Sequence, residues 1–439
     1  MLLSVIPMSV SAESINHDTT LYISISGNDS TGDGSYENPY ATMEKAYGEV
    51  LQTGGKIVVK SDGANAFNSH TATQKIMPAC AGTVYVYGIP DNNGDYPTLD
   101  FSRTSSTGAT VFNLGCSMVF YNLDITNNGG NLWFSAAFHE LTFGYGITMS
   151  MPSGKVSVTG GYHSNGITAN HATDRECNIN IYSGVFGDCY LGHFADMSSK
   201  GEAYIVKEAS VFNFIGGTAA NIYVFRHDEN GYKCYKADAT INMYGGTVTG
   251  AIAVRPELIK KNNKSATLNL YNGNEPTTIG DAFKHESIGG TLNRLTCDHI
   301  PAPEYIVSYS GVQNTGINTD TTDDIPDNTY SVRFVAVMGQ DYTAYSKAGF
   351  KIMVGGIDQG GDCNNVYTSI AAEGTDDYTA AELGGEYIFA YTLRKIPVSS
   401  GTVTFTVTPY VYIGETQYFG AAYTVVYNAG TFVSSTPAN

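Results

Sequence analysis

The feature that most constrains the fold of this chain is a short segment that recurs through its middle. Each copy reads apolar, Asn or Ser, apolar, any residue, any residue, Gly. The five copies are VSVTGG from Val156, INIYSG from Ile179, FNFIGG from Phe212, INMYGG from Ile241 and LNLYNG from Leu268. Their polar positions are 157, 180, 213, 242 and 269, so successive copies lie 23, 33, 29 and 27 residues apart. Such repeats are typical of a solenoid, and unequal spacing indicates loops of different length between its strands.

Alternation within each copy assigns its residues to two faces. The first and third positions predict a stacked core line of Ile179, Ile181, Phe212, Phe214, Ile241, Met243, Leu268 and Leu270. The Asn lies on the other face, as do Tyr182, Tyr244 and Tyr271 two residues further on. Rows of like residues stabilise neighbouring coils. Tyr rings can also form a platform on which sugar rings stack, and both interpretations stay open here.

Composition places the whole chain in the all-β class. It contains 49 Gly, and the runs between them are rich in β-branched and aromatic residues. Helical periodicity is confined to the stretch around Ala41–Leu51. With 41 acidic against 23 basic residues the net charge is -18, which excludes a nucleic-acid partner on electrostatic grounds.

The first residues indicate export. Residues 1–12, MLLSVIPMSVSA, combine a short apolar run with a small-x-small end, as in the remnant of a signal peptide. No segment reaches the ~20 apolar residues that a membrane span needs. We therefore expect a secreted or cell-surface protein with no membrane span.

The segment Leu21–Ala46, LYISISGNDSTGDGSYENPYATMEKA, resembles the opening of many secreted parallel β-helix proteins. That superfamily includes pectate lyases and other polysaccharide lyases. The matching residues are Tyr22, Gly27, Asp29, Ser30, Gly34, Ser35, Pro39, Tyr40, Thr42 and Ala46. The resemblance implies a right-handed parallel β-helix whose open end is capped by a short helix. It implies no activity, because enzymes and non-enzymes share this opening.

A second domain follows a change of composition near Pro301–Pro303. Strand-like runs recur there at Tyr330–Met338, Phe350–Val354, Tyr387–Leu393, Thr402–Tyr412 and Ala422–Tyr427. This spacing predicts an immunoglobulin-like β-sandwich, and the segment resembles C-terminal modules of large secreted proteins from Gram-positive anaerobes. The predicted organisation is signal-peptide remnant (1–12), N-terminal strand and capping helix (13–54), parallel β-helix (55–300), linker (301–329) and sandwich (330–439).

The repeat also suggests candidate site residues. Thirteen residues after the Asn of three copies stand His193, Arg226 and Arg255. The acidic residues Asp196, Asp228 and Glu257 follow closely. Cations beside acids at one edge would suit a polysaccharide lyase, which needs a positive group near a uronate and a base. Surface ion pairs that merely neutralise one another give the same pattern.

Two further features leave alternatives open. The Gly-rich loop with Asp29, Asp33 and Glu37 suggests Ca²⁺ as a cofactor, although solvated carboxylates give the same pattern and no calcium motif is present. The seven cysteines are scattered without close pairs, so most are expected to be buried as small hydrophobes.

These observations predict a protein that engages an extracellular polysaccharide as a non-catalytic binding or adhesive surface. The alternative is a carbohydrate-active enzyme, a polysaccharide lyase or a glycoside hydrolase, that works in a groove along the β-helix. Fold alone does not decide between them.

Overall fold

The structure is a computed structural model, and its described residues form two compact units, His17–Cys297 and Asp298–Asn439. The described residues are 20–68, 70–88, 95–104, 109–163, 176–194, 204–225, 235–296, 300–301, 307–318, 328–338, 345–363, 366–367, 369–370, 378–379, 387–413, 416–420 and 422–437.

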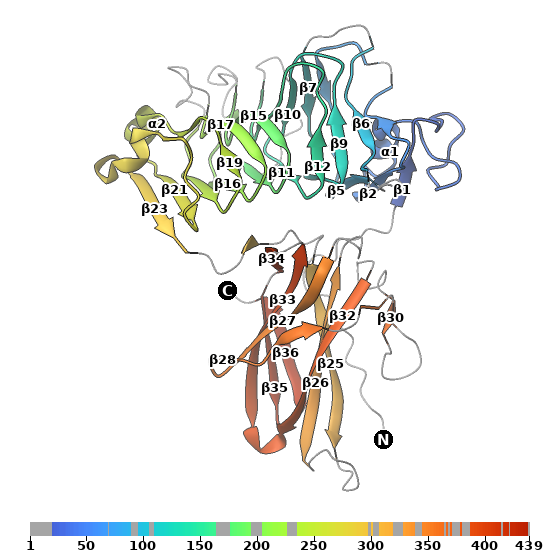
Figure 1. Cartoon of the computed structure of the whole chain (residues 1–439), viewed down its shortest axis with the longest axis vertical. Helices are drawn as coiled ribbons and strands as arrows, with labels where there is room; N and C mark the ends of the chain where they lie inside the picture. Colours follow the sequence, from blue (N-terminus) through green and yellow to red (C-terminus); the bar gives the residue numbers. More distant parts are fainter. Residues whose placement is uncertain are drawn as a thin grey trace. The chain divides into compact units, whose positions relative to one another are not determined.

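The first unit is a parallel β-helix, which runs from blue to yellow in Figure 1. Its longest sheet, the long sheet, has ten parallel strands, one from almost every coil. In spatial order they are β1 (Thr20–Ile23), β2 (Gly55–Val59), β5 (Val84–Gly88), β8 (Met118–Tyr121), β11 (Glu140–Phe143), β14 (Asn178–Ile181), β16 (Ser210–Phe214), β18 (Ala239–Met243), β21 (Ala266–Tyr271) and β23 (Gly290–Leu295). Their order in space is their order in sequence, as a solenoid requires.

Two further parallel sheets complete the coils. The second sheet contains β4 (Gln74–Ile76), β7 (Thr110–Asn113), β10 (Leu132–Ser135), β13 (Val156–Thr159), β15 (Val185–Tyr190), β17 (Thr218–Tyr223), β19 (Thr247–Val248), β20 (Ala251–Ala253) and β22 (Thr278–Ile279). The third sheet contains β3 (Ala64–Asn65), β6 (Thr98–Asp100), β9 (Leu123–Thr126) and β12 (Ile147–Met149). The described coils therefore use three sheets early in the chain and only two after β12.

The predicted core line is confirmed. All eight of its side chains are at most 1% exposed, and β14, β16, β18 and β21 pair in parallel with their Asn residues opposite one another. The all-β class and the parallel solenoid predicted from the sequence are therefore correct.

One copy of the repeat lies in a different row from the other four. The VSVTGG copy forms β13, which belongs to the second sheet, so Ser157 is not in line with the Asn residues. The place before Asn180 in the long sheet belongs to Thr142 of β11. In both sheets every second side chain belongs to the core, so period-two alternation alone cannot tell one sheet from the other.

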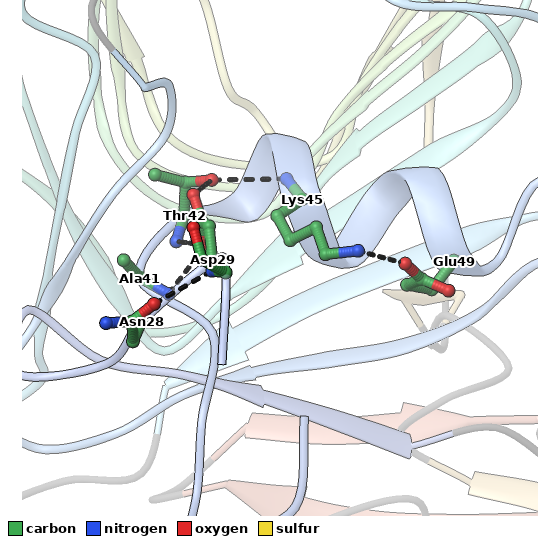
Figure 2. Close-up of polar contacts among 7 residues, drawn as sticks. Asn28, Asp29, Ala41, Thr42, Lys45 and Glu49 are labelled. Carbon is green, nitrogen blue, oxygen red and sulfur yellow. Dashed lines mark hydrogen bonds and ion pairs between the residues drawn. The ribbon is translucent and has the colours of Figure 1, made fainter. Parts of the chain in front are cut away.

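The predicted helix is α1 (Met43–Glu49), at the blue end of the solenoid in Figure 1. Thr42 is its N-cap and accepts a hydrogen bond from the Lys45 N–H (3.1 Å), as Figure 2 shows. Met43, Ala46 and Tyr47 are buried against the core. An apolar face over the first coil shields core side chains that an open stack would expose. Neither α1 nor any other described helix has the length and apolar character to cross a membrane.

The second unit is a β-sandwich of mainly antiparallel sheets, in orange to red in Figure 1. One sheet is β25 (Val307–Asn318), β26 (Thr329–Met338) and β32 (Tyr387–Pro397). The other contains β24 (Ile300–Pro301), β27 (Tyr345–Val354), β28 (Ile357–Asp358), β29 (Gly361–Cys363), β33 (Thr402–Ile413), β34 (Thr416–Phe419), β35 (Tyr423–Asn428) and β36 (Thr431–Pro437), while β30 (Ser369–Ile370) pairs with β31 (Tyr378–Thr379). Phe334 meets Phe405 (centroids 5.4 Å apart) between the two larger sheets.

The predicted strands of this unit are present, but the predicted linker 301–329 is too long. Within it β25 pairs with β26 from Val307 to Asn318. The Asn, Thr and Gly residues of β25 give this segment the composition of a linker. It forms a strand because its backbone makes hydrogen bonds with β26.

Replacing Ile241 with Asp tests the core line. An unpaired buried carboxylate should destabilise the solenoid by roughly 4 kcal/mol or more. Thr240→Asp is the matched control, because Thr240 is half-buried on the opposite face of β18, and it should cost less than about 1 kcal/mol. Urea unfolding followed by circular dichroism measures both. Equal losses for the two variants would contradict the assignment of faces.

Expressing residues 298–439 alone tests the independence of the sandwich. Because this unit has its own buried contacts, including Phe334–Phe405 and Phe350–Phe389 (5.1 Å), the fragment should unfold in one cooperative thermal transition. A broad, non-cooperative melt of the soluble fragment would show that its core is incomplete.

Candidate functional site

An asparagine ladder runs along the outer face of the long sheet. Each amide donates from Nδ2 to Oδ1 of the preceding coil, at 2.7–2.8 Å, from Asn293 through Asn269, Asn242 and Asn213 to Asn180. Asn180 in turn donates to the Thr142 hydroxyl (3.1 Å). The sequence repeat does not include Asn293 on β23, because its segment TLNRL lacks the closing glycine. The inner amides have partners in both directions, so the ladder stabilises the coils.

The tyrosines proposed as a sugar platform lie beside this ladder. Tyr244 and Tyr271 stack with centroids 4.4 Å apart and ring planes 10° from parallel. Tyr182 is 8% exposed, and its ring meets Tyr145 at 62°. In a parallel stack each ring covers a face of its neighbour. A role in binding stays a prediction for these three residues, and the geometry gives them a structural role between coils.

The charged candidates are only partly described. Arg226, Asp196 and Asp228 lie outside the described residues, and so does the side chain of Glu257 on α2 (Pro256–Asn262). Arg255 follows β20 and is half-buried. Tyr190, Tyr223 and Ala253 are register partners in successive coils. Arg255 therefore stands one residue out of register with His193, because Ala253 lies one residue further from its Asn than Tyr190 and Tyr223 lie from theirs.

His193 is buried, with 3% of its surface exposed. Its Nδ1 accepts a hydrogen bond from the Tyr162 N–H (2.8 Å), so its Nε2 carries the proton and donates to the Tyr204 carbonyl (2.8 Å). Burial lowers the pKa of His193 to about 4. The neutral ring joins two turns of the solenoid, and in this arrangement a ligand at the surface reaches neither nitrogen.

The structure assembles an aromatic cluster that the sequence did not reveal, on the outer face of the second sheet. Trp133, the one tryptophan of the chain, lies 4.5 Å from His163 and 4.6 Å from Phe194 between ring centroids. His163 and Phe194 stack at 4.7 Å, and Tyr190 lies 5.4 Å from Tyr223. We call these five residues the outer aromatic cluster. It is separate from the main core.

The cluster combines buried and half-exposed rings. Trp133 and Tyr190 are 8% and 6% exposed, whereas His163, Phe194 and Tyr223 are half-buried. The buried pair thus anchors rings that still contact solvent. Trp133 lies on β10, Tyr190 on β15 and Tyr223 on β17. His163 and Phe194 lie in the turns that follow β13 and β15. No fixed spacing in the sequence connects the five residues.

A β-bulge places polar groups beside the outer aromatic cluster. Between β13 and β15 the register shifts, because Val156 pairs with Phe186 but Val158 pairs with Cys189. The extra residue in β15 leaves Asp188 half-buried, where its Oδ1 accepts from Asn221 Nδ2 (2.8 Å). Burial and the charge of Asp188 raise the pKa of Tyr223. Bulges commonly re-aim side chains next to functional sites.

The acidic N-terminal loop has a structural role in this arrangement. Asp29 accepts hydrogen bonds from the N–H groups of Ala41 and Thr42 and from the Thr42 hydroxyl, at 2.7–3.1 Å (Figure 2). The N–H of Ser35 is the main cause that lowers the pKa of Asp33. Within the described residues no three His, Cys, Asp or Glu side chains are grouped to hold a metal ion. The suggestion of Ca²⁺ remains a prediction without geometric support.

A polar pocket of about 580 Å³ adjoins this loop. Asn28, Asn65 and Asn68 are among the residues that line it, together with Arg103, which is 7% exposed. Arg103 Nη1 lies 3.5 Å from the Thr71 carbonyl. Such a lining suits hydroxyl groups or a carboxylate.

Comparisons with protein-family models, curated proteins and solved structures found no significant match. What this chain binds is therefore inferred from its own side chains.

Replacing His193 with Asn tests its neutral, buried state. The folded pKa, about 4, lies below the value near 6.5 of an unfolded His, so the unfolded chain binds more protons between these limits. The stabilising contribution of neutral His193 is therefore fully present above about pH 6.5. As the pH falls below that value, the free energy of unfolding decreases by at most about 1.4 kcal/mol per pH unit.

Asn is a suitable replacement because its Oδ1 can still accept from the Tyr162 N–H. Between pH 7.5 and pH 5.0, the wild-type solenoid should lose roughly 2 kcal/mol more free energy of unfolding than His193→Asn. Urea titrations at the two pH values measure the difference. Identical pH dependences would show that His193 titrates normally.

Proposed function

We propose that this chain is a secreted or cell-surface β-helix protein that binds an extracellular polysaccharide through the outer aromatic cluster, without chemical turnover. The observation that carries the proposal is a set of half-exposed rings, outside the core, on one face of the solenoid. Protein sites for sugars combine an aromatic ring, which covers the apolar face of a pyranose, with polar groups for its hydroxyls.

The outer aromatic cluster provides both components. His163, Phe194 and Tyr223 are rings with solvent contact. Asp188 and Asn221 lie in register on the neighbouring strands β15 and β17, next to Tyr190 and Tyr223. A carboxylate accepts from sugar hydroxyls, and an amide can donate to them and accept from them. Buried Trp133 and Tyr190 fix the cluster in advance, which lowers the entropic cost of binding.

The charge of the chain narrows the class of glycan. A net charge of -18 repels polyanions at long range, so a neutral polysaccharide is the favoured ligand. Arg226 follows Tyr223 by three residues and Asp196 follows Phe194 by two. These charged residues of the sequence prediction are therefore close to the cluster in the sequence, and they remain candidates for further contacts.

Export and family membership form part of the same proposal. The signal-peptide-like residues 1–12 and the opening Leu21–Ala46 support a secreted member of the superfamily that includes pectate lyases. The parallel sheets fit that superfamily. Because fold does not imply activity, the ligand-binding surface must be tested directly.

Glycan-array screening of the full chain, followed by affinity electrophoresis with the polysaccharides it selects, tests the proposal. Tyr223→Ala and Phe194→Ala should each weaken binding about tenfold, equivalent to about 1.4 kcal/mol, because each removes a stacking face. Tyr223→Phe should keep most of the affinity, since it retains the ring.

Tyr271→Ala is the matched control, because it removes a half-buried tyrosine from the long sheet instead. Unchanged binding is expected for this variant. If Tyr271→Ala weakens binding and Tyr223→Ala does not, the tyrosines beside the asparagine ladder form the site. Unsaturated or shortened products in the same assays would establish the alternative, a polysaccharide lyase or glycoside hydrolase.

A further inference from the structure

Two cysteines that are far apart in the sequence lie side by side near α1. The Cys80 N–H donates to the Gly115 carbonyl (3.2 Å), and the Met77 N–H donates to the Asn113 carbonyl (3.0 Å). The segments that carry Cys80 and Cys116 therefore still run in parallel beyond β4 and β7, with the register shifted by one residue so that Cys80 lies opposite Cys116. Neighbouring strands lie about 4.8 Å apart, which is within the Cα separation of roughly 4.4–6.8 Å that a disulfide requires.

The side chains of the two cysteines share one environment. Cys116 Sγ is buried 3.4 Å from the Tyr47 hydroxyl, which donates to the Pro78 carbonyl (2.9 Å). Cys80 is half-buried, and its thiol donates to the Val50 carbonyl (3.2 Å). Because Tyr47 belongs to α1 and Val50 is its C-cap, both thiols pack directly beneath the capping helix.

The two thiols differ in a way that suits stepwise oxidation. The Cys116 thiol is the largest influence that lowers the pKa of Cys80, and the N–H groups of Gly82, Gly54 and Ala81 act in the same direction. The Cys80 partner and burial raise the pKa of Cys116. Cys80, which solvent can reach, is thus the nucleophile, and buried Cys116 is the resolving thiol.

We propose that Cys80 and Cys116 form a reversible disulfide that fastens the first coils of the solenoid beneath α1. Cys80 thiolate attacks one sulfur of a small-molecule disulfide, forming a mixed disulfide and releasing one thiolate. Cys116 gives its proton to that thiolate and attacks Cys80 Sγ, and the second small thiol leaves and takes up a proton from water. One external disulfide is reduced to two thiols while one protein disulfide forms.

The remaining described cysteines do not compete for this chemistry. Cys177 and Cys189 are fully buried, and burial raises the pKa of both thiols. Cys363 lies in the other unit, and burial raises its pKa to about 12. Among the described residues Cys80 is therefore the preferred site of attack. The cross-link would close a chain loop that contains β5, β6 and β7.

The test uses the full native chain with oxidised glutathione as the probe. After incubation, free thiols are alkylated and the protein is digested for mass spectrometry. The expected product is a Cys80–Cys116 peptide pair lighter by two hydrogens, which dithiothreitol separates. Thermal unfolding of the oxidised protein should shift upward by several degrees, because the cross-link restricts the unfolded chain.

Variants distinguish the pair from other thiols. Cys80→Ser should abolish the cross-link and leave Cys116 unmodified while the protein is folded, whereas Cys177→Ser should leave the cross-link intact. Stable single glutathionylation of Cys80 in the wild-type protein, with Cys116 still a free thiol, would overturn the proposal. So would a cross-link of Cys80 to any other cysteine. The wild-type measurement decides the question even if a variant folds poorly.

Discussion

In-register pairing of parallel strands along the long sheet is the constraint on which the rest of the solenoid depends. Because each residue lies over its equivalent in the next coil, the side chain of Asn242 reaches Asn213 on one side and Asn269 on the other. These half-buried amides would lose hydrogen bonds if any coil slipped. A slip of one residue would also move Ile241 from the core to the outer face. Polar and apolar rows therefore enforce the same register.

The register is constant although the coils differ in length. Successive hydrogen bonds of the ladder, counted from Thr142, join residues 38, 33, 29, 27 and 24 apart in the sequence. Much of this variation lies between the end of a second-sheet strand and the next strand of the long sheet. The long connections after β13 and β15 begin with the turns that hold His163 and Phe194. Insertions between these strands leave the pairing of both sheets intact.

Local alternation in the sequence predicts the core correctly. It does not predict contacts between residues of different coils. Ile179 and Leu268 can be assigned to the core because period-two burial is visible within six residues. The bulge at Asp188, the cluster around Trp133 and the contact between Cys80 and Cys116 each join separate coils. Since the coils differ in length, no constant offset reveals such neighbours. The thirteen-residue count that relates His193 to Arg255 fails by one residue for the same reason.

A perfectly regular solenoid is also a poor surface for stacking a ligand. Where like rings follow one another in register, as Tyr244 and Tyr271 do, each ring covers a face of the next. In the outer aromatic cluster only some rings stack in this way. His163 and Phe194 are 7° from parallel, but Trp133 is tilted by 41° to Phe194 and Tyr190 by 31° to Tyr223. The bulge beside β15 adds Asp188 to the same face. The irregular positions of the second sheet thus give this face both ring surfaces and polar groups. The regular long sheet supplies the rigidity that holds these groups in place.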